Sequence, residues 1–369
     1  MSSFKKPAFF SFILATIILL IVGFLALISA SSGTGARLYG DPLYYVKQQY
    51  LIGLAVALFA GFIFYKIPYQ FWQKTSVFWL VATLLLVLLA FIPRFELPGE
   101  TAHRWLKLGP LSIQPSEFLR FFYIIFLAAW LAKTPIAELK SFSRGVLPFA
   151  IVLGIISLIL IKQPATSIVF LIGTTAMAMY LIAGMRWKHL VILVVFALIC
   201  GSALIFLAKD YRLERILVTF FPEKADVSKL QQKEESLEGI GSGKIFGVGY
   251  FDSVKKFQYL PLGFSDYIFA IYAEETGFVG SLALIGLYLF FLVSGFKLAC
   301  SNQDLFARYA GFGLIFTVGL QAFTTIAVNV GLLPVTGLPL PFVSYGKSNL
   351  LVMAMTVSFV LNTAKRKTT

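Results

Sequence analysis

The feature that most constrains this chain is a series of apolar runs that recurs from one end to the other. Ten runs are candidates for helices that cross the roughly 30 Å hydrocarbon core of a membrane. They lie at residues 9–30, 50–65, 76–92, 118–132, 146–161, 168–185, 190–207, 269–293, 309–330 and 350–361. Because a helix satisfies its own backbone hydrogen bonds in lipid, these runs predict an all-α polytopic membrane protein.

The composition agrees with lipid as the solvent for much of the surface. Hydrophobic residues make up 59% of the 369 positions and charged residues only 13%, whereas a soluble domain carries about 25% charged residues. Lys5 and Lys6 precede the first run, which is too long for the apolar region of a signal peptide and is interpreted as a retained first span. We expect one integral membrane domain over residues 1–369.

The charges between the runs predict the orientation. An even number of crossings places both ends on one side of the membrane. If that side is cytoplasmic, the cytoplasmic segments hold 14 basic and two acidic residues, and the outer segments hold 17 basic and 15 acidic ones. The positive-inside rule therefore predicts that both termini are cytoplasmic. It also accounts for the net charge of +14 without nucleic-acid binding.

Three outer segments are longer than a simple connection requires, at residues 93–117, 209–265 and 332–349. Long connections in compact proteins are usually functional or disordered. The charged stretch 223–238 predicts a solvated, mobile part of the middle segment. With Cys200, Cys300 and two histidines in the whole chain, no nitrogen–sulfur metal site is expected.

Acidic residues at membrane depth are functional candidates because a charge in lipid costs a few kcal/mol or more. Asp266 opens the eighth run, and Glu274 and Glu275 follow in the same run. At 100° per residue, Asp266 and Glu274 could share the wall of a polar cavity. Asp266 could equally be a helix cap, and the two glutamates could hold helices together through ion pairs.

Basic residues accompany them at the outer side. Arg104 and Lys107 lie just outside the membrane, where arginine suits forked contact with phosphate, although an arginine beside a tryptophan is also an ordinary interfacial anchor. Glu117 and Arg120 are three residues apart where the fourth run begins, so they could pair with each other or face Glu274. A carboxylate beside arginines suits a general base acting on a hydroxyl or a proton-coupling site in a transporter.

Short motifs then connect the chain to a known family. They are Tyr39-Gly40-Asp41-Pro42 with Lys47 and Gln49, Arg104-Trp105-Leu106 with Gln114-Pro115-Ser116-Glu117, Gly241-Ser242-Gly243 with Gly247-Val248-Gly249, Tyr259-Leu260-Pro261 with Ser265-Asp266-Tyr267-Ile268-Phe269-Ala270 and Glu274-Glu275-Thr276-Gly277, and Asn329-Val330-Gly331 with Ser344-Tyr345-Gly346. Taken in this order, the motifs are spread over nearly the whole length of the chain. The chain therefore resembles the SEDS family (shape, elongation, division and sporulation), which includes FtsW, RodA and SpoVE.

The resemblance implies a peptidoglycan glycosyltransferase that joins lipid II units at the outer face of the cytoplasmic membrane and releases undecaprenyl diphosphate. It implies that Asp266 is catalytic and that Arg104, Glu117 and Arg120 bind substrate. We add the remaining outer candidates as substrate-binding residues, namely Lys107, Glu274, Glu275 and Ser344. Cations could offset charge on the departing diphosphate, with a divalent ion (Mg or Mn) as an optional cofactor.

The resemblance also implies partners, a class B penicillin-binding protein that acts as transpeptidase and other division or elongation proteins. The segments 30–32 and 253–256 resemble FtsW more than RodA, which favours a role in division. Two rival functions stay open, a lipid II flippase and a division scaffold without activity of its own. Four positions depart from the family pattern: Ala165, Glu235, Phe264, and Lys347 in place of a glycine.

Overall fold

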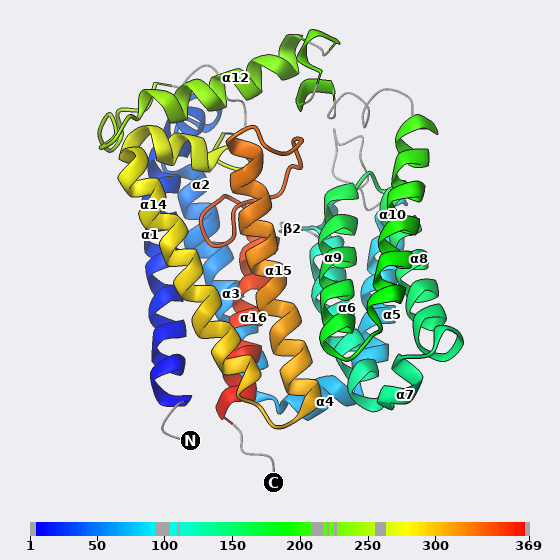
Figure 1. Ribbon diagram of the computed structural model, residues 1–369. Helices are drawn as coiled ribbons and strands as arrows, with labels where there is room; N and C mark the ends of the chain where they lie inside the picture. Colours follow the sequence, from blue (N-terminus) through cyan, green and yellow to red (C-terminus); the bar gives the residue numbers. More distant parts are fainter. Residues whose placement is uncertain are drawn as a thin grey trace.

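The computed structural model is a bundle of long helices and describes residues 5–92, 104–108, 111–207, 217–219, 221–224, 227–254 and 263–365. Both ends of the chain lie at the same end of the bundle (Figure 1). One helix, α12 (Val227–Ser242), crosses the opposite end. This arrangement is the one that an even number of crossings requires.

Helices account for nearly all of the regular structure in the described residues. They are α1 (Lys5–Tyr39), α2 (Tyr44–Val46), η1 (Lys47–Gly53), α3 (Leu54–Lys66), α4 (Tyr69–Lys74), α5 (Ser76–Leu89), α6 (Pro115–Lys133), α7 (Ile136–Leu139), η3 (Phe142–Val146), α8 (Leu147–Lys162), α9 (Thr166–Ile182), α10 (Trp187–Leu207), η4 (Pro222–Lys224), α12, α14 (Ile268–Cys300), α15 (Leu305–Asn329) and α16 (Lys347–Lys365). The strands β1 (Leu106–Leu108) and β2 (Leu111–Ile113) form a short antiparallel hairpin.

All ten predicted apolar runs coincide with helices, so the all-α membrane class is confirmed. Among the residues that the structure describes, six helical segments are long and apolar enough to cross a membrane, and three shorter apolar helices accompany them. The count of ten crossings stays a prediction, as does the single domain. Helix ends differ from the apolar runs, since α1 continues to Tyr39 and α14 to Cys300.

Helices α6, α15 and α16 form the centre of the bundle, and most residues of α16 are buried. The apolar window of α6 is 78% buried and that of α15 is 67% buried, against 22% for α14. Helix α6 begins with Pro115 in its first turn, a position where the missing N–H of proline costs no helical hydrogen bond. Polar side chains on the facing sides of α6 and α15 are therefore enclosed by protein.

Most of the charged stretch 223–238, predicted to be solvated and mobile, forms α12, and its side chains Glu234 and Glu238 are exposed as expected. Ser236, Gly239 and Gly243 recur at helical spacing and are buried, so this small-residue face can lie close to α14. A side chain on Gly243 would place its Cβ 2.3 Å from the carbonyl oxygen of Ala273. The charged residues dominate the composition, but this narrow face decides the packing.

The segment between α15 and α16 folds back into the bundle instead of extending outward (orange in Figure 1). Leu338, Leu340, Phe342 and Val343 are each at most 3% exposed. An irregular segment can lie at this depth only if its polar backbone is bonded to protein. Its hydrogen bonds therefore help to define the site.

Candidate functional site

Asp266 lies in the turn that precedes α14, at the end of the bundle opposite the termini, and is partly buried. The hydroxyl of Ser265 donates a hydrogen bond to Asp266 Oδ1 at 2.9 Å. The backbone oxygen of Asp266 accepts a hydrogen bond from Asn329 Nδ2 at 3.0 Å. The main chain of this aspartate is thus fixed while its carboxylate keeps some exposure.

Asn329, at the end of α15, was not among the predicted site residues. Its Oδ1 accepts a hydrogen bond from the backbone N–H of Ala270 at 3.1 Å, and its side chain is fully buried. The hydroxyl of Ser236 donates to the backbone oxygen of Asn329 at 2.9 Å. One amide therefore connects α15 to the backbone of Asp266 and to the first turn of α14. The motif Asn329-Val330-Gly331 drew attention to the position, but the motif itself does not reveal this contact.

Ser344 fixes the other side of the same turn. Its hydroxyl donates to the backbone oxygen of Ser265 at 2.6 Å and accepts from the N–H of Leu340 at 2.8 Å. A Cβ on Gly337, which has a φ of +67°, would lie 3.6 Å from Asp266 Oδ2. The segment 332–346 therefore forms one wall beside the aspartate. Ser344 is 4% exposed, so the structure places it as a support for this wall.

Arg104 reaches the same region from the hairpin side. Its Nη2 donates to the carbonyl oxygen of Pro164, between α8 and α9, at 2.7 Å. Nearby, the hydroxyl of Ser167 donates to the carbonyl oxygen of Thr336 at 2.5 Å, next to Gly337. The contacts of Arg104 with Pro164 and of Ser167 with Thr336 thus link Arg104, through the start of α9, to the wall beside Asp266. The backbone of Lys107 pairs with Ser112, and its side chain lies outside the described part of the structure.

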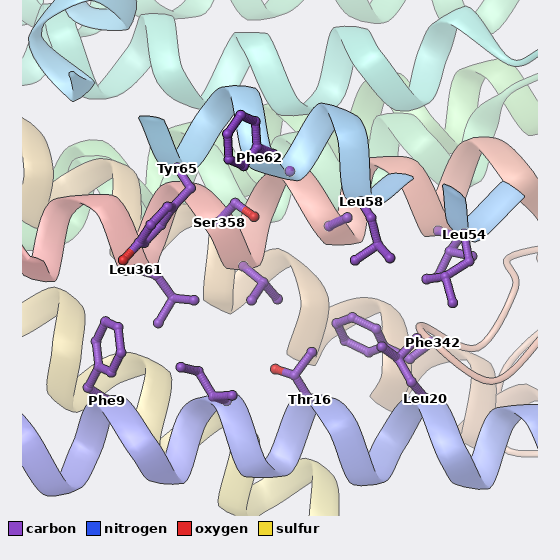
Figure 2. Close-up of a pocket in the computed structure, with 15 residues that line it drawn as sticks. Phe9, Thr16, Leu20, Leu54, Leu58, Phe62, Tyr65, Phe342, Ser358 and Leu361 are labelled. Atoms are coloured by element: carbon purple, nitrogen blue, oxygen red, sulfur yellow. The ribbon is translucent and has the colours of Figure 1, made fainter. Parts of the chain in front are cut away.

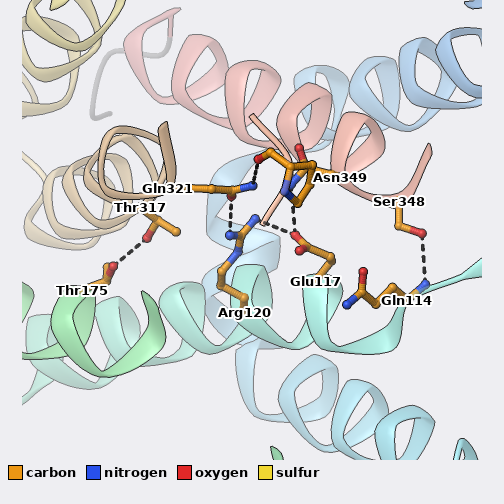
Figure 3. Close-up of polar contacts among 9 residues, drawn as sticks. Gln114, Glu117, Arg120, Thr175, Thr317, Gln321, Ser348 and Asn349 are labelled. Carbon is orange, nitrogen blue, oxygen red and sulfur yellow. Dashed lines mark hydrogen bonds and ion pairs between the residues drawn. The ribbon is translucent and has the colours of Figure 1, made fainter. Parts of the chain in front are cut away.

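Glu117 and Arg120 pair with each other and do not face Glu274 (Figure 3). Arg120 Nη2 lies 2.6 Å from Glu117 Oε2, with both side chains at most 2% exposed. Arg120 Nη1 also donates to Gln321 Oε1 at 2.5 Å, and Asn349 Nδ2 donates to Glu117 Oε2 at 3.3 Å. The pair joins α6 to α15 and α16 in an enclosed network. In this arrangement it supports the site from within the bundle and does not present charge to a ligand.

Glu274 and Glu275 are also enclosed and bind the outer segments. Glu274 Oε2 accepts from the hydroxyl of Ser253 at 2.5 Å, and Glu274 Oε1 accepts from the N–H of Val254 at 3.2 Å. Glu275 accepts a short hydrogen bond from Ser29 of α1. The prediction that these glutamates could hold elements together agrees with these contacts, although hydroxyl and backbone donors take the place of cations.

The close backbone packing around Glu274 and Glu275 requires glycine at two positions. Gly277 breaks α14 with a φ of +67°, a conformation that side chains disfavour. A Cβ on Gly247 would lie 2.0 Å from the carbonyl oxygen of Glu275. The N–H of Val248 donates to the carbonyl oxygen of Glu274 at 3.0 Å. The glycine motifs of the sequence therefore let the outer segment pack directly on the break in α14.

Beside the segment 332–346, the described carboxylate that could reach a divalent cation is Asp266. No group of three or more His, Cys, Asp and Glu side chains exists among the residues that the structure describes. Mg²⁺ often binds through one or two carboxylates together with substrate phosphates. Asp266 fits that type of site, whereas the residues do not form a cage for a resident ion.

The whole chain is similar to known proteins. Residues 10–369 match the FtsW/RodA/SpoVE family, described as cell cycle protein. The chain is 35% identical to the probable peptidoglycan glycosyltransferase FtsW of Saccharophagus degradans, over 93% of this chain and 89% of that protein.

Two solved structures share the fold. One, described as a peptidoglycan synthase complex that coordinates polymerization and crosslinking, matches with a TM-score of 0.77 and 26% identity over 96% of this chain and 97% of its own. RodA of Thermus thermophilus matches with a TM-score of 0.68 and 25% identity over 96% of this chain and 95% of its own.

Proposed function

This chain belongs to the FtsW/RodA/SpoVE family of cell cycle proteins, and from that premise we propose that it is a peptidoglycan glycosyltransferase with Asp266 as general base. It is a multi-pass membrane protein. It polymerises lipid II at the outer face of the cytoplasmic membrane and keeps both termini in the cytoplasm. The basic cytoplasmic segments and the shared location of the two ends support this orientation (Figure 1).

One observation carries the assignment of Asp266. Its carboxylate is partly exposed beside the folded-back segment 332–346, while Asn329 and Ser344 fix the backbone on either side of it. A general base must reach the proton that it removes and must be held there by its surroundings. Asp266 meets both requirements, whereas Glu117, Glu274 and Glu275 are at most 4% exposed.

The reaction needs one displacement. As the acceptor hydroxyl oxygen bonds to the anomeric carbon of the donor, Asp266 takes the hydroxyl proton. The bond between that carbon and the diphosphate breaks, and the diphosphate leaves with the electron pair. An α-linked donor gives a β-linked product in this single inverting step, so one base carboxylate suffices. A divalent cation, when bound, would neutralise part of the diphosphate charge.

The remaining site residues have supporting roles. Arg104 precedes the β1–β2 hairpin and contacts Pro164, and it offsets part of the charge on the departing diphosphate. Glu117 and Arg120 hold α6 against α15 and α16, Glu274 holds Ser253 of the outer segment on α14, and Glu275 holds α1 against α14. These residues act as positioning residues.

The cross-linking partner is a class B penicillin-binding protein that acts as transpeptidase. The similarity to a complex described as coordinating polymerization and crosslinking supports this assignment. The FtsW relative supports a role in cell division.

The test is polymerisation of labelled lipid II by the purified protein, alone and with its transpeptidase, for wild type and Asp266→Asn. We expect glycan chains from wild type and a loss of rate of about 10²–10⁴-fold in the variant. Asp252→Asn, which removes an exposed outer carboxylate, is the control and should polymerise normally. Undiminished glycan from Asp266→Asn would remove Asp266 from the mechanism, and transport of lipid II without glycan would favour a flippase.

A further inference from the structure

An apolar groove of about 400 Å³ runs along the membrane-spanning part of the bundle between α1 and α3, with α16 as its floor (Figure 2). Phe9, Thr16 and Leu20 line it from α1, and Leu54 and Tyr65 line it from α3. The two walls belong to helical segments long and apolar enough to cross the membrane. The groove therefore faces a lipid environment along its length.

Small residues explain why the groove exists. Gly61, Ala354 and Ser358 line it where α3 meets α16, and a Cβ on Gly61 would lie 2.8 Å from Ser358 Oγ. Close packing of α3 on α16 leaves α1 at a distance from α3. Larger side chains such as Phe9 and Tyr65 form the sides, and the space between them stays open.

The outer end of the groove meets the wall of the proposed site. Phe342 lines the groove and belongs to the same folded-back segment as Gly337 and Ser344. A Cβ on Gly23 of α1 would lie 2.3 Å from the carbonyl oxygen of Phe342. Tyr50 donates from its hydroxyl to the carbonyl oxygen of Leu20 at 3.2 Å. These contacts close the groove at the segment that borders Asp266.

A lysine lies just beyond this outer end. Lys347 begins α16 one turn before Leu350, which lines the groove, and its Cγ would lie 3.2 Å from a Cβ on Gly53, next to Leu54. Lys347 Nζ donates to Gln48 Oε1 at 3.3 Å, and within the described part of the chain it forms no ion pair. A cation at a helix N-terminus opposes the helix dipole, so a bound anion would be favourable there.

We propose that this groove holds the isoprenoid tail of a polyprenyl diphosphate lipid and that Lys347 binds the phosphate of that lipid at the groove's outer end. The apolar lining matches an isoprenoid tail, and the adjacent cation matches a phosphate. A single groove between two helices has room for one hydrocarbon tail, whereas a bilayer phospholipid has two. The assignment rests on the proposed function for its substrate class. It gives a role to a lysine that stands where the family pattern has glycine.

Photo-crosslinking of the full-length protein in lipid nanodiscs tests the site. The probes are a diazirine-bearing polyprenyl phosphate and, as the second arm, a diazirine-bearing phosphatidylglycerol. We expect the isoprenoid probe to label residues of α1, α3 and α16 around the groove and to be displaced by undecaprenyl diphosphate but not by phosphatidylglycerol. Equal labelling and displacement by phosphatidylglycerol would overturn the proposal, as would protection of the groove only by a bound partner protein.

Two matched sets of variants separate binding of the tail from binding of the phosphate. Ala354→Phe fills the groove, and Ala55→Phe adds the same bulk on the exposed face of α3. Lys347→Gln removes the cation, Lys347→Arg retains it, and Lys297→Gln removes an exposed lysine from α14. We expect Ala354→Phe to abolish specific labelling and Lys347→Gln to weaken it roughly tenfold or more, with Arg restoring it and both controls unchanged. Wild-type affinity in either Ala354→Phe or Lys347→Gln would overturn the proposal.

Polymerisation distinguishes this inference from the proposed function. If wild type makes glycan and Lys347→Gln and Ala354→Phe keep its KM for lipid II, the groove assignment fails and the function stands. If wild type is labelled specifically but makes no glycan with or without its transpeptidase, the function fails and the groove assignment stands.

Discussion

Asp266 and the buried glutamates differ in their surroundings although all lie toward one end of the bundle. Asp266 is partly exposed, and its carboxylate accepts a hydrogen bond from the hydroxyl of the neighbouring Ser265. Glu117 is 1% exposed and contacts Arg120 and Asn349, and Glu274 is 2% exposed and contacts Ser253 and Val254. A carboxylate that joins distant elements stabilises the fold, whereas one held through its backbone can act on a ligand. The difference predicts which substitutions change rate and which change stability.

Asp266→Asn gives the largest expected effect. The polymerisation rate should fall by about 10²–10⁴-fold, while the melting temperature in detergent stays near that of wild type because the backbone contacts remain. Measuring the polymerisation rate and the thermal unfolding of the same preparation checks both expectations. A large loss of stability would mean that Asp266 is structural like the glutamates.

Arg120→Met should destabilise the protein by about 3–5 kcal/mol, because it leaves Glu117 buried without its cation. Thermal or denaturant unfolding in detergent measures the loss. The double variant Glu117→Gln with Arg120→Met removes both charges and should recover much of the stability. If the single and double variants are equally unstable, the unpaired charge of Glu117 is not the cause of the loss.

Asn329→Ala should cost about 1–3 kcal/mol, since the N–H of Ala270 and the carbonyl oxygen of Asp266 lose a buried partner. We also expect kcat to fall roughly tenfold with little change in KM, because Asp266 is no longer held in place. Asn362→Ala is the matched control, since Asn362 is fully buried and donates to the backbone oxygens of Phe64, Tyr65 and Ile67. An equal fall of kcat in this control would show a general loss of folding.

Asp41→Asn should have the smallest effect. Hydrogen bonds from the Lys47 ammonium, at 2.7 Å, and from the N–H of Leu43 lower the pKa of Asp41 below its ordinary value of 3.8. The hydrogen-bonded carboxylate of Asp41 therefore contributes fully to stability above pH 3.8, and this contribution is lost as the pH falls through the lowered pKa. Melting curves of wild type and variant should nearly coincide at neutral pH, and the small difference should vanish in acid. A large difference at neutral pH would show a further role for this exposed pair.

Some of the site could be located before the fold was known. Asp266, Arg104 and Glu117 stood out because ionisable residues are rare in so apolar a chain, and the motifs placed them on one side. Asn329 and Gln321 did not stand out, because an uncharged amide in a helix gives no such signal until its partners across the bundle are known. The contact between Glu117 and Arg120 was one of two options at their spacing, and only the packing of α6 against α15 selected it.

The sequence by itself determined the membrane class and the helical segments, because hydrophobic length acts locally and does not depend on neighbours, and its loop charges predict the direction of the chain. Tertiary structure decided which carboxylates are enclosed, that α12 forms within a charged stretch, and that segment 332–346 folds back to border Asp266. These outcomes depend on close approach between residues far apart in the chain, as where Gly247 meets the backbone of Glu275. Hydropathy and spacing carry no information about such approach, since it arises from how the helices pack.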